Sequence, residues 1–226
     1  MTVSHKELNL RNNKISNINI LEYVDFKELK ELDLSNNEIS DIELLKNVKF
    51  DKLEILNFKN NNISNINILE YINFKELKEL YLNINQISDI EVLKKVNFDK
   101  LEILNLRHNN ISNINILEYV NFKELKELYL EYNKILDIEA LKKVNFDKLE
   151  ILNLRHNNIS NINILEYVNF KELKELNLEY NEITDIEVLK KVNFDKLEIL
   201  NLRHNNISNK KSSIINYLQS NICLIL

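Results

Sequence analysis

The sequence predicts an α/β solenoid: a curved stack of short units with parallel strands on its concave face and short helices on its convex face. Three observations lead to this fold class. A leucine recurs every 24 residues, apolar and polar residues alternate around it, and apolar residues at intervals of three follow. Long stretches are also nearly identical, because residues 98–133 and 146–181 differ at one position. A repeated pattern of this kind predicts stacked units rather than one globular core.

The strand is predicted from the residues around the recurring leucine. Leu32 and Leu34 alternate with Asp33 and Ser35, which is the period of a strand with one buried face. The marker leucine occupies nine equally spaced positions, which predict nine parallel strands: Leu8, Leu32, Leu56, Leu80, Leu104, Leu128, Leu152, Leu176 and Leu200.

A short α or 3₁₀ helix is predicted after each strand. Ile39, Ile42, Leu45 and Val48 follow at intervals of three, and Phe50 closes the unit. The segment 40–43 has the sequence of a capping box, which predicts that Ser40 caps the helix. One unit has too little core to fold alone, so it must stack on its neighbours. Because the helical side is wider than the strand side, we expect the sheet to be concave.

One asparagine occupies the position at which each strand ends and the chain turns inward. An amide can both donate and accept hydrogen bonds there, so we expect a continuous buried ladder. The ladder comprises Asn13, Asn37, Asn61, Asn85, Asn109, Asn133, Asn157, Asn181 and Asn205.

The frame L-x-x-L-x-L-x-x-N-x-I resembles the leucine-rich repeat family over residues 5–209. The sequence pattern Asn-x-Ile-Ser-Asp-Ile-Glu-x-Leu is similar to the repeats of internalins and of a regulatory subunit of type-1 protein phosphatase. The resemblance implies a protein-binding scaffold. We expect residues 1–209 to form nine 24-residue repeats, grouped in 48-residue double repeats. Residues 210–226 break the pattern and carry apolar residues at helical spacing, which predicts a C-terminal capping helix.

Charges alternate in sign from one repeat to the next in three rows. Alternation converts repulsion between neighbouring repeats into attraction, although each exposed pair contributes only about 0.2–1 kcal/mol. Recent duplication of a 48-residue segment explains the near-identity equally well. The rows are Lys27, Asp51, Lys75, Asp99, Lys123, Asp147, Lys171 and Asp195; Glu28, Lys52, Glu76, Lys100, Glu124, Lys148, Glu172 and Lys196; and Glu22, Lys46, Glu70, Lys94, Glu118, Lys142, Glu166 and Lys190.

The concave face carries the candidate binding residues, because the concave sheet is the usual binding surface of a solenoid and Tyr and Arg are common interface anchors. The candidates are Tyr81, Ile84, Arg107, His108, Tyr129, Tyr132, Arg155, His156 and Tyr180. The alternative is that these residues pack on one another. The histidines and tyrosines should form a stacked ladder. Like histidines lie two strands apart, about 10 Å, which is too far for shared metal coordination.

Several functions are disfavoured by composition. The chain shows no nucleophile–base set, glycine loop or Cys/His cluster, so we expect no enzyme activity, cofactor or metal. The net charge of −5 argues against nucleic acid, and the apolar runs are too short to span a membrane. The N-terminus has no apolar run of signal-peptide length, which predicts a cytoplasmic location and leaves export without a classical signal open.

Two functions therefore remain. The first is a scaffold that binds a partner protein through the concave sheet. The second is a structural or self-associating solenoid that pairs through its uncapped N-terminal edge, because only MTVSH precedes the first strand.

Overall fold

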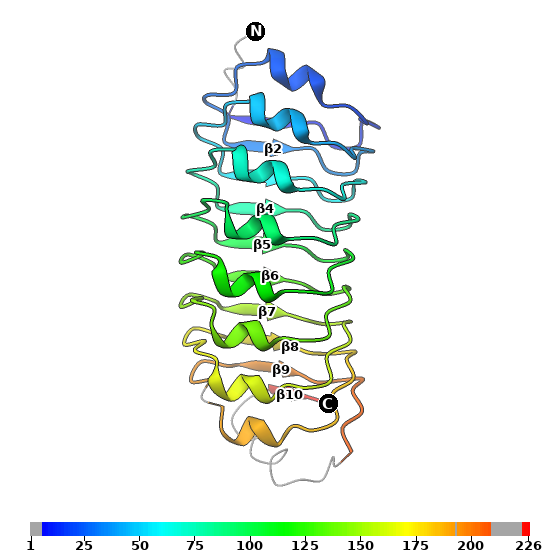
Figure 1. Ribbon diagram of the computed structural model, residues 1–226, viewed down its shortest axis with the longest axis vertical. Helices are drawn as coiled ribbons and strands as arrows, with labels where there is room; N and C mark the ends of the chain where they lie inside the picture. The colour runs from blue at the N-terminus through cyan, green and yellow to red at the C-terminus, as the bar shows by residue number, and fades with distance from the viewer. Residues whose placement is uncertain (1–5, 193, 209–222) are drawn as a thin grey trace.

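The computed structural model describes residues 6–192, 194–208 and 223–226, which form a curved solenoid (Figure 1). Ten parallel strands make one sheet, and their order in the sheet is their order in the sequence. The strands are β1 Glu7–Asn9, β2 Glu31–Asp33, β3 Ile55–Asn57, β4 Glu79–Tyr81, β5 Ile103–Asn105, β6 Glu127–Tyr129, β7 Ile151–Asn153, β8 Glu175–Asn177, β9 Ile199–Asn201 and β10 Cys223–Ile225.

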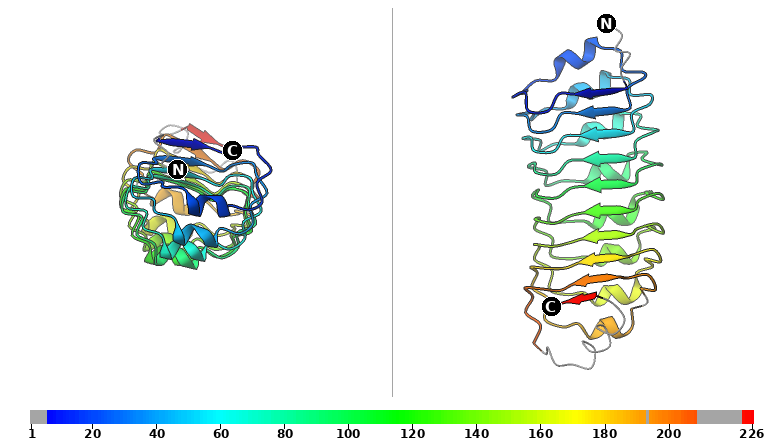
Figure 2. Two further views of the ribbon diagram at one scale, coloured as in Figure 1. Left: turned by 90° about the horizontal axis from the view of Figure 1, so that it is seen from above. Right: turned by 180° about the vertical axis from the view of Figure 1, so that it is seen from behind.

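The opposite face carries 3₁₀ helices, and a view along the stack shows the sheet and the helices as two layers (Figure 2). The helices are η1 Asn19–Tyr23, η2 Glu43–Asn47, η3 Asn67–Tyr71, η4 Glu91–Lys94, η5 Asn115–Tyr119, η6 Glu139–Lys142, η7 Asn163–Tyr167 and η8 Glu187–Lys190. The register from β1 to β9 is 24 residues throughout, as in Leu8 opposite Leu32, which confirms the predicted stacking.

The core is shared between repeats rather than enclosed within one. Leu32 and Leu34 are fully buried, and Ile39, Ile42 and Leu45 pack behind them. A phenylalanine column runs through successive repeats and comprises Phe26, Phe50, Phe74, Phe98 and Phe122, with the ring centroids of Phe50 and Phe74 5.9 Å apart. Each phenylalanine of this column therefore packs against one from the adjacent repeat, and the interior exists only where repeats stack.

The predicted asparagine ladder is present and buried from Asn37 to Asn181, whereas Asn13 is exposed and Asn205 is partly buried. Asn109 Nδ2 donates to the carbonyl oxygen of Leu106 in its own repeat and to that of Leu82 in the preceding repeat, both at 3.0 Å. Its Oδ1 accepts from the backbone N–H of Ile87 at 2.9 Å. The side chain is thus bonded to two repeats, and it satisfies backbone groups that leave the sheet.

Two local predictions are wrong. Each helix begins one residue after an isoleucine without a side-chain cap, so Ser40 does not form a capping box. Instead Asp41 Oδ1 accepts from the backbone N–H of Glu43 at 2.8 Å, and Asn17 does the same for Asn19. These hydrogen bonds join a side chain to the backbone N–H two residues later, whereas a capping box spans three residues. The shorter span matches the tight start of a 3₁₀ turn.

At the C-terminus, the predicted helix is wrong for Cys223–Ile225, which form β10 and pair with β9. Without this strand, β9 would have unpaired backbone N–H and C=O groups at its edge. An apolar segment can hydrogen-bond to these groups as a further strand. Residues 209–222, and with them the boundary proposed at residue 210, lie outside the described residues.

The charge rows are paired in part. The row that contains Glu28 and Lys52 forms ion pairs in every second step, among them Lys100–Glu76 at 2.5 Å and Lys148–Glu124 at 2.5 Å. Among the described residues, the row of Lys27 shows no pair between repeats. The third row is displaced by one residue, because Glu70 pairs with Lys95 at 2.7 Å instead of Lys94.

The sequence interpretation missed a fourth alternating row, directly before the strands. It comprises Lys30, Glu54, Lys78, Glu102, Lys126, Glu150, Lys174 and Glu198. Glu54 pairs with both Lys30 and Lys78, and the hydrogen bonds from these two lysines lower the pKa of Glu54 to about 2.

We expect Asn109→Ala to lower the free energy of unfolding by about 3 kcal/mol, because it leaves the buried Ile87 N–H without a partner and removes one of the two asparagine hydrogen bonds at each of the Leu82 and Leu106 carbonyls. The matched control is Asn110→Ala at the adjacent exposed residue, for which we expect a change within about 0.5 kcal/mol. Urea unfolding followed by circular dichroism measures both. Equal midpoints for the two variants would contradict the role given to the ladder.

Candidate protein-binding surface

The concave face presents the outward residues of the strands in columns. Tyr81 and Tyr129 occupy one column, two strands apart, because both face Asn105 in the sheet register. The column beyond the strand ends carries Arg107, Glu131 and Arg155 in line, as predicted. The structure therefore places the predicted anchors on one face, across β4 to β8.

The two tyrosines are fixed by hydrogen bonds within their strands. The Tyr81 hydroxyl donates to Glu79 at 2.8 Å, and the Tyr129 hydroxyl donates to Glu127 at 2.7 Å. Burial, followed by these hydrogen bonds, raises the pKa of both phenols. Each ring is thus half-buried and held in one orientation, which lowers the entropy cost of using it as a contact.

At the edge where the strands end, one column of residues has a left-handed backbone, with φ between 51° and 60°, and Lys14 adds a second such residue in the first repeat. The column comprises Asn12, Asn36, Asn60, Ile84, His108, Tyr132, His156, Tyr180 and His204. Asn tolerates this conformation, whereas it is strained for a β-branched residue such as Ile84 at φ 58°. The chain thus makes a turn without glycine in every repeat, and at Ile84 the turn is under strain.

The predicted His/Tyr stack is present along this edge. The centroid distance is 5.2 Å for His108–Tyr132, 4.3 Å for Tyr132–His156 and 4.1 Å for His156–Tyr180. Arg155 lies over the rings of Tyr132 and Tyr180, 5.5 and 5.4 Å from their centroids, in cation–π geometry. Burial and the nearby Arg155 lower the pKa of His156, which favours the neutral ring in the stack. These side chains therefore pack on one another, as the alternative expectation stated, and their role in binding stays a prediction.

Three buried side-chain atoms lack a hydrogen bond in the described part of the chain: Asn83 Oδ1, Glu131 Oε2 and Arg155 Nε. All three belong to the column beyond the strand ends. Arg155 Nε lies 2.7 Å from Glu179 Oε2, so this contact is an ion pair whose geometry is not that of a hydrogen bond. Glu131 lies between two arginines, its Oε1 3.6 Å from Arg107 Nε, and burial raises its pKa. Sequence reasoning placed Glu131 in this row but gave no sign that Asn83 and Glu131 are buried.

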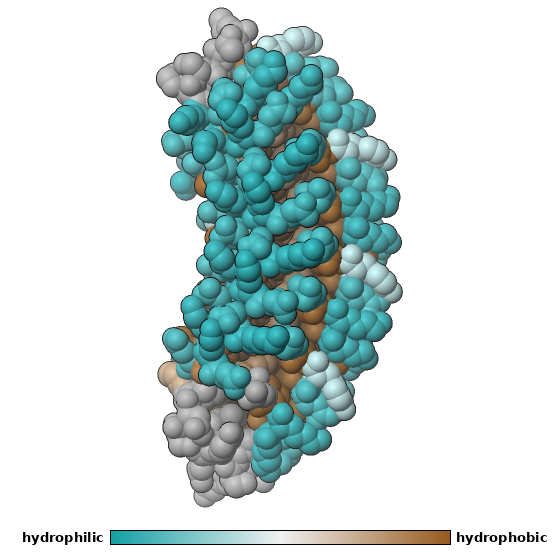
Figure 3. All heavy atoms as spheres, turned by 90° about the vertical axis from the view of Figure 1, so that its left-hand side faces the viewer, coloured by the Kyte–Doolittle hydropathy of each residue, from teal (hydrophilic) through white to brown (hydrophobic). Residues whose placement is uncertain are grey.

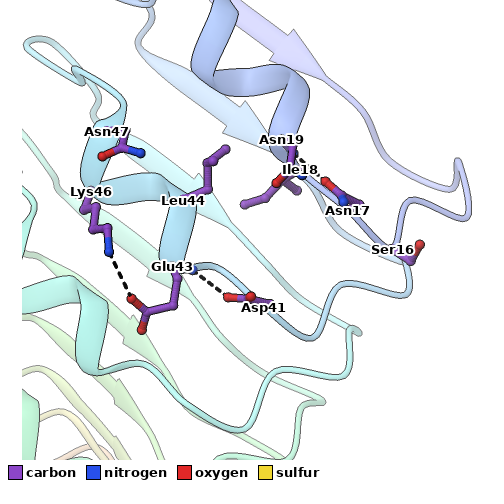
Figure 4. Close-up of a pocket in the computed structure, with 9 residues that line it drawn as sticks. All are labelled: Ser16, Asn17, Ile18, Asn19, Asp41, Glu43, Leu44, Lys46 and Asn47. Carbon is purple, nitrogen blue, oxygen red and sulfur yellow. Dashed lines mark hydrogen bonds and ion pairs between the residues drawn. The ribbon is translucent and has the colours of Figure 1, made fainter.

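The convex face has shallow depressions between an odd-numbered helix and the helix that follows it. In the one between η1 and η2 the Leu44 side chain lies between the helices, and Glu43 contacts Lys46 at 3.8 Å (Figure 4). Related depressions adjoin Tyr71 and Tyr167. Their linings consist mainly of exposed polar residues and carry both signs of charge. The nine predicted residues are absent from these three linings.

The described residues include no cluster of three potential metal ligands. Among the helices described, none has the length and apolar composition needed to cross a lipid bilayer.

Family models match most of the chain. The model described as Leucine Rich repeats (2 copies) matches residues 6–47, 51–95, 99–143 and 147–191, and the model Leucine Rich Repeat matches residues 196–219. With its parallel strands, 3₁₀ helices and asparagine ladder, the chain is a repeat solenoid of a recognisable class. It belongs to the leucine-rich repeat family.

Solved structures share this fold. A leucine-rich repeat protein of Leptospira interrogans superposes with a TM-score of 0.78 at 23% identity, over 98% of this chain and 60% of that one. Internalin C2 of Listeria monocytogenes gives 0.72 at 22% identity, over 89% and 80%. The ectodomain of the Arabidopsis thaliana receptor kinase GASSHO1/SCHENGEN3 gives 0.62 at 27%, over 79% and 22%. A comparison with curated protein sequences found no match.

We expect Ile84→Asn to raise the free energy of unfolding by about 1 kcal/mol, because Asn adopts the left-handed backbone at lower cost. The reverse change Asn60→Ile, in the same column, should lower it by a similar amount and also removes the Asn60–Asn36 hydrogen bond. Thermal unfolding of both variants tests the expectation. A loss of stability in Ile84→Asn would show that packing outweighs strain at this position.

Proposed function

We propose that this chain is a scaffold that binds a partner protein through the concave face, centred on Tyr81, Tyr129 and Arg155. The observation that supports this most is the position of the three buried polar atoms without hydrogen bonds. An unsatisfied buried group costs about 1–3 kcal/mol, which applies to Asn83 Oδ1 and Glu131 Oε2, because the ion pair with Glu179 compensates Arg155 Nε. All three atoms lie in one column beside the two fixed tyrosines. Sites that retain such a cost are often functional.

The contact chemistry agrees with a protein partner. Tyr81, Tyr129 and Arg155 are of the residue types that most often anchor interfaces. Ile84, Arg107, His108, Tyr132, His156 and Tyr180 complete the proposed surface, in agreement with the sequence-based candidates. Arg107 remains substantially exposed, so it can reorient toward a partner group.

The family supports the same class of function. Leucine-rich repeat proteins generally mediate protein–protein interaction and are typically not enzymes. The plant receptor ectodomain was solved in complex with CASPARIAN STRIP INTEGRITY FACTOR 2. A net charge of −5 supports a protein partner over nucleic acid. Self-association through β1 stays a prediction, since residues 1–5 lie outside the described part of the chain.

The test is affinity capture from the source organism with three baits: the unchanged chain, a concave variant Tyr81→Ala/Tyr129→Ala/Arg155→Ala, and a convex control Lys94→Ala/Lys142→Ala. The control removes two exposed lysines from η4 and η6. We expect a protein that is retained by the first and third baits and lost from the second. With that protein purified, the concave variant should bind at least about 10-fold more weakly, since anchor residues contribute above 1 kcal/mol each. The same proteins retained by all three baits would exclude the concave site.

A further inference from the structure

A second surface of the solenoid is the flank where the chain passes from each helix to the next strand. Figure 3 shows this flank as an apolar stripe along the arc, between ridges of hydrophilic side chains. Its partly exposed apolar side chains are Val24, Ile72, Val96, Val144, Val168 and Val192. A continuous partly apolar stripe of this length is uncommon on a protein that is alone in solution.

Four rows of this flank alternate along the stack, three between acidic and basic residues and one between Tyr and an amide or basic residue, and each row has eight members. Three rows alternate in charge, beginning at Lys27, Glu28 and Lys30 and ending at Asp195, Lys196 and Glu198. The fourth comprises Tyr23, Asn47, Tyr71, Lys95, Tyr119, Lys143, Tyr167 and Lys191. A row that alternates over an even number of members begins with one type and ends with the other. If a second copy of the row runs in the opposite direction, each member therefore lies opposite a member of the other type.

From this we infer that two copies of the chain pair antiparallel through this flank, about a twofold axis at its centre. Glu28 of one copy then lies opposite Lys196 of the second copy, and Lys100 lies opposite Glu124. In the fourth row, Tyr71 lies opposite Lys143, which permits a cation–π contact. A parallel copy in register would place like charges opposite each other, which is destabilising. The surface thus selects one orientation.

The spacing and the shape favour a second copy over other partners. The period of another copy equals the period of this chain, so every repeat is matched along the contact. The flank is the side of the arc, as Figure 3 shows, so two copies related by a twofold axis along the radius keep the same curvature. Two copies that paired through their convex faces, by contrast, would be in contact over only a few repeats. The concave face stays open, so the pairing does not depend on the proposed function.

Internal ion pairs do not remove this complementarity. Lys100 pairs with Glu76 and Lys148 pairs with Glu124 within one chain, but all four side chains remain at least 40% exposed. Each internal pair would face a reversed pair of the second copy. Each of these four charges then gains a second neighbour of opposite sign without losing the first.

Sedimentation and light scattering across a concentration series test the pairing. We expect the mass to rise from one 27.0 kDa chain toward two. Lys100→Glu should raise the dissociation constant at least about 10-fold, because it places like charges together on both sides of the axis. The double swap Lys100→Glu/Glu124→Lys should restore dimerisation, although it breaks two internal ion pairs. Lys134→Glu, exposed on the opposite flank, is the matched control and should leave it unchanged.

Spin labels test the orientation in the background Cys223→Ser. A label on Asp99→Cys, near the axis, should give a short distance between the two copies. A label on Lys27→Cys should give a distance close to the length of the sheet. Short distances at both sites would show a parallel pair and overturn the proposal. A monomer at every concentration, or a double swap that fails to rescue Lys100→Glu, would overturn it as well.

Discussion

A 24-residue repeat of this chain has no interior of its own, and the rest of the structure depends on that constraint. Its leucines and isoleucines are buried only where the next repeat covers them, and Phe50 and Phe74 pack against each other across the boundary. Asn109 bonds the backbone of two repeats at once. Apolar burial and hydrogen bonding therefore act at the same interfaces, and stability belongs to pairs of repeats rather than to single ones.

The same constraint separates structure from function on the surface. Inward positions are nearly invariant because each must match its copies on both sides, whereas outward positions are free to differ. The outward differences fall into two sets. Irregular residues such as Asn83 and Ile84 lie on the concave face and its edge, where strain and unsatisfied polar atoms also lie. Regular alternation runs along the flank and the helices, where it serves neighbouring repeats and, in our proposal, a second copy; from Arg107 onward it also runs through the Arg/Glu and His/Tyr columns of the concave side.

The sequence predicts those features of the structure that depend on local residues, and it does not predict those that depend on packing in three dimensions. Leu32, Leu34 and the asparagine ladder were predictable, because periodicity and side-chain chemistry determine them locally. The pairing of Glu70 with Lys95 instead of Lys94 was not, since it depends on the rotation of a 3₁₀ helix. Cys223–Ile225 form a short apolar run that suits either a helix or a strand. They form a strand because the edge of β9 is available for pairing. The lack of a donor for Asn83 Oδ1 depends on packing in three dimensions, and no local pattern indicates it.

The most direct test of the account is to vary the number of repeats. Residues 99–146 form one 48-residue unit whose flanking sequences allow its removal or duplication without changing the junction. Urea unfolding of chains with one unit fewer, the present number and one unit more should show a midpoint that rises with each unit, while the isolated unit stays unfolded. An isolated unit that folds, or a midpoint that does not change with length, would contradict the claim that repeats obtain their interior from their neighbours.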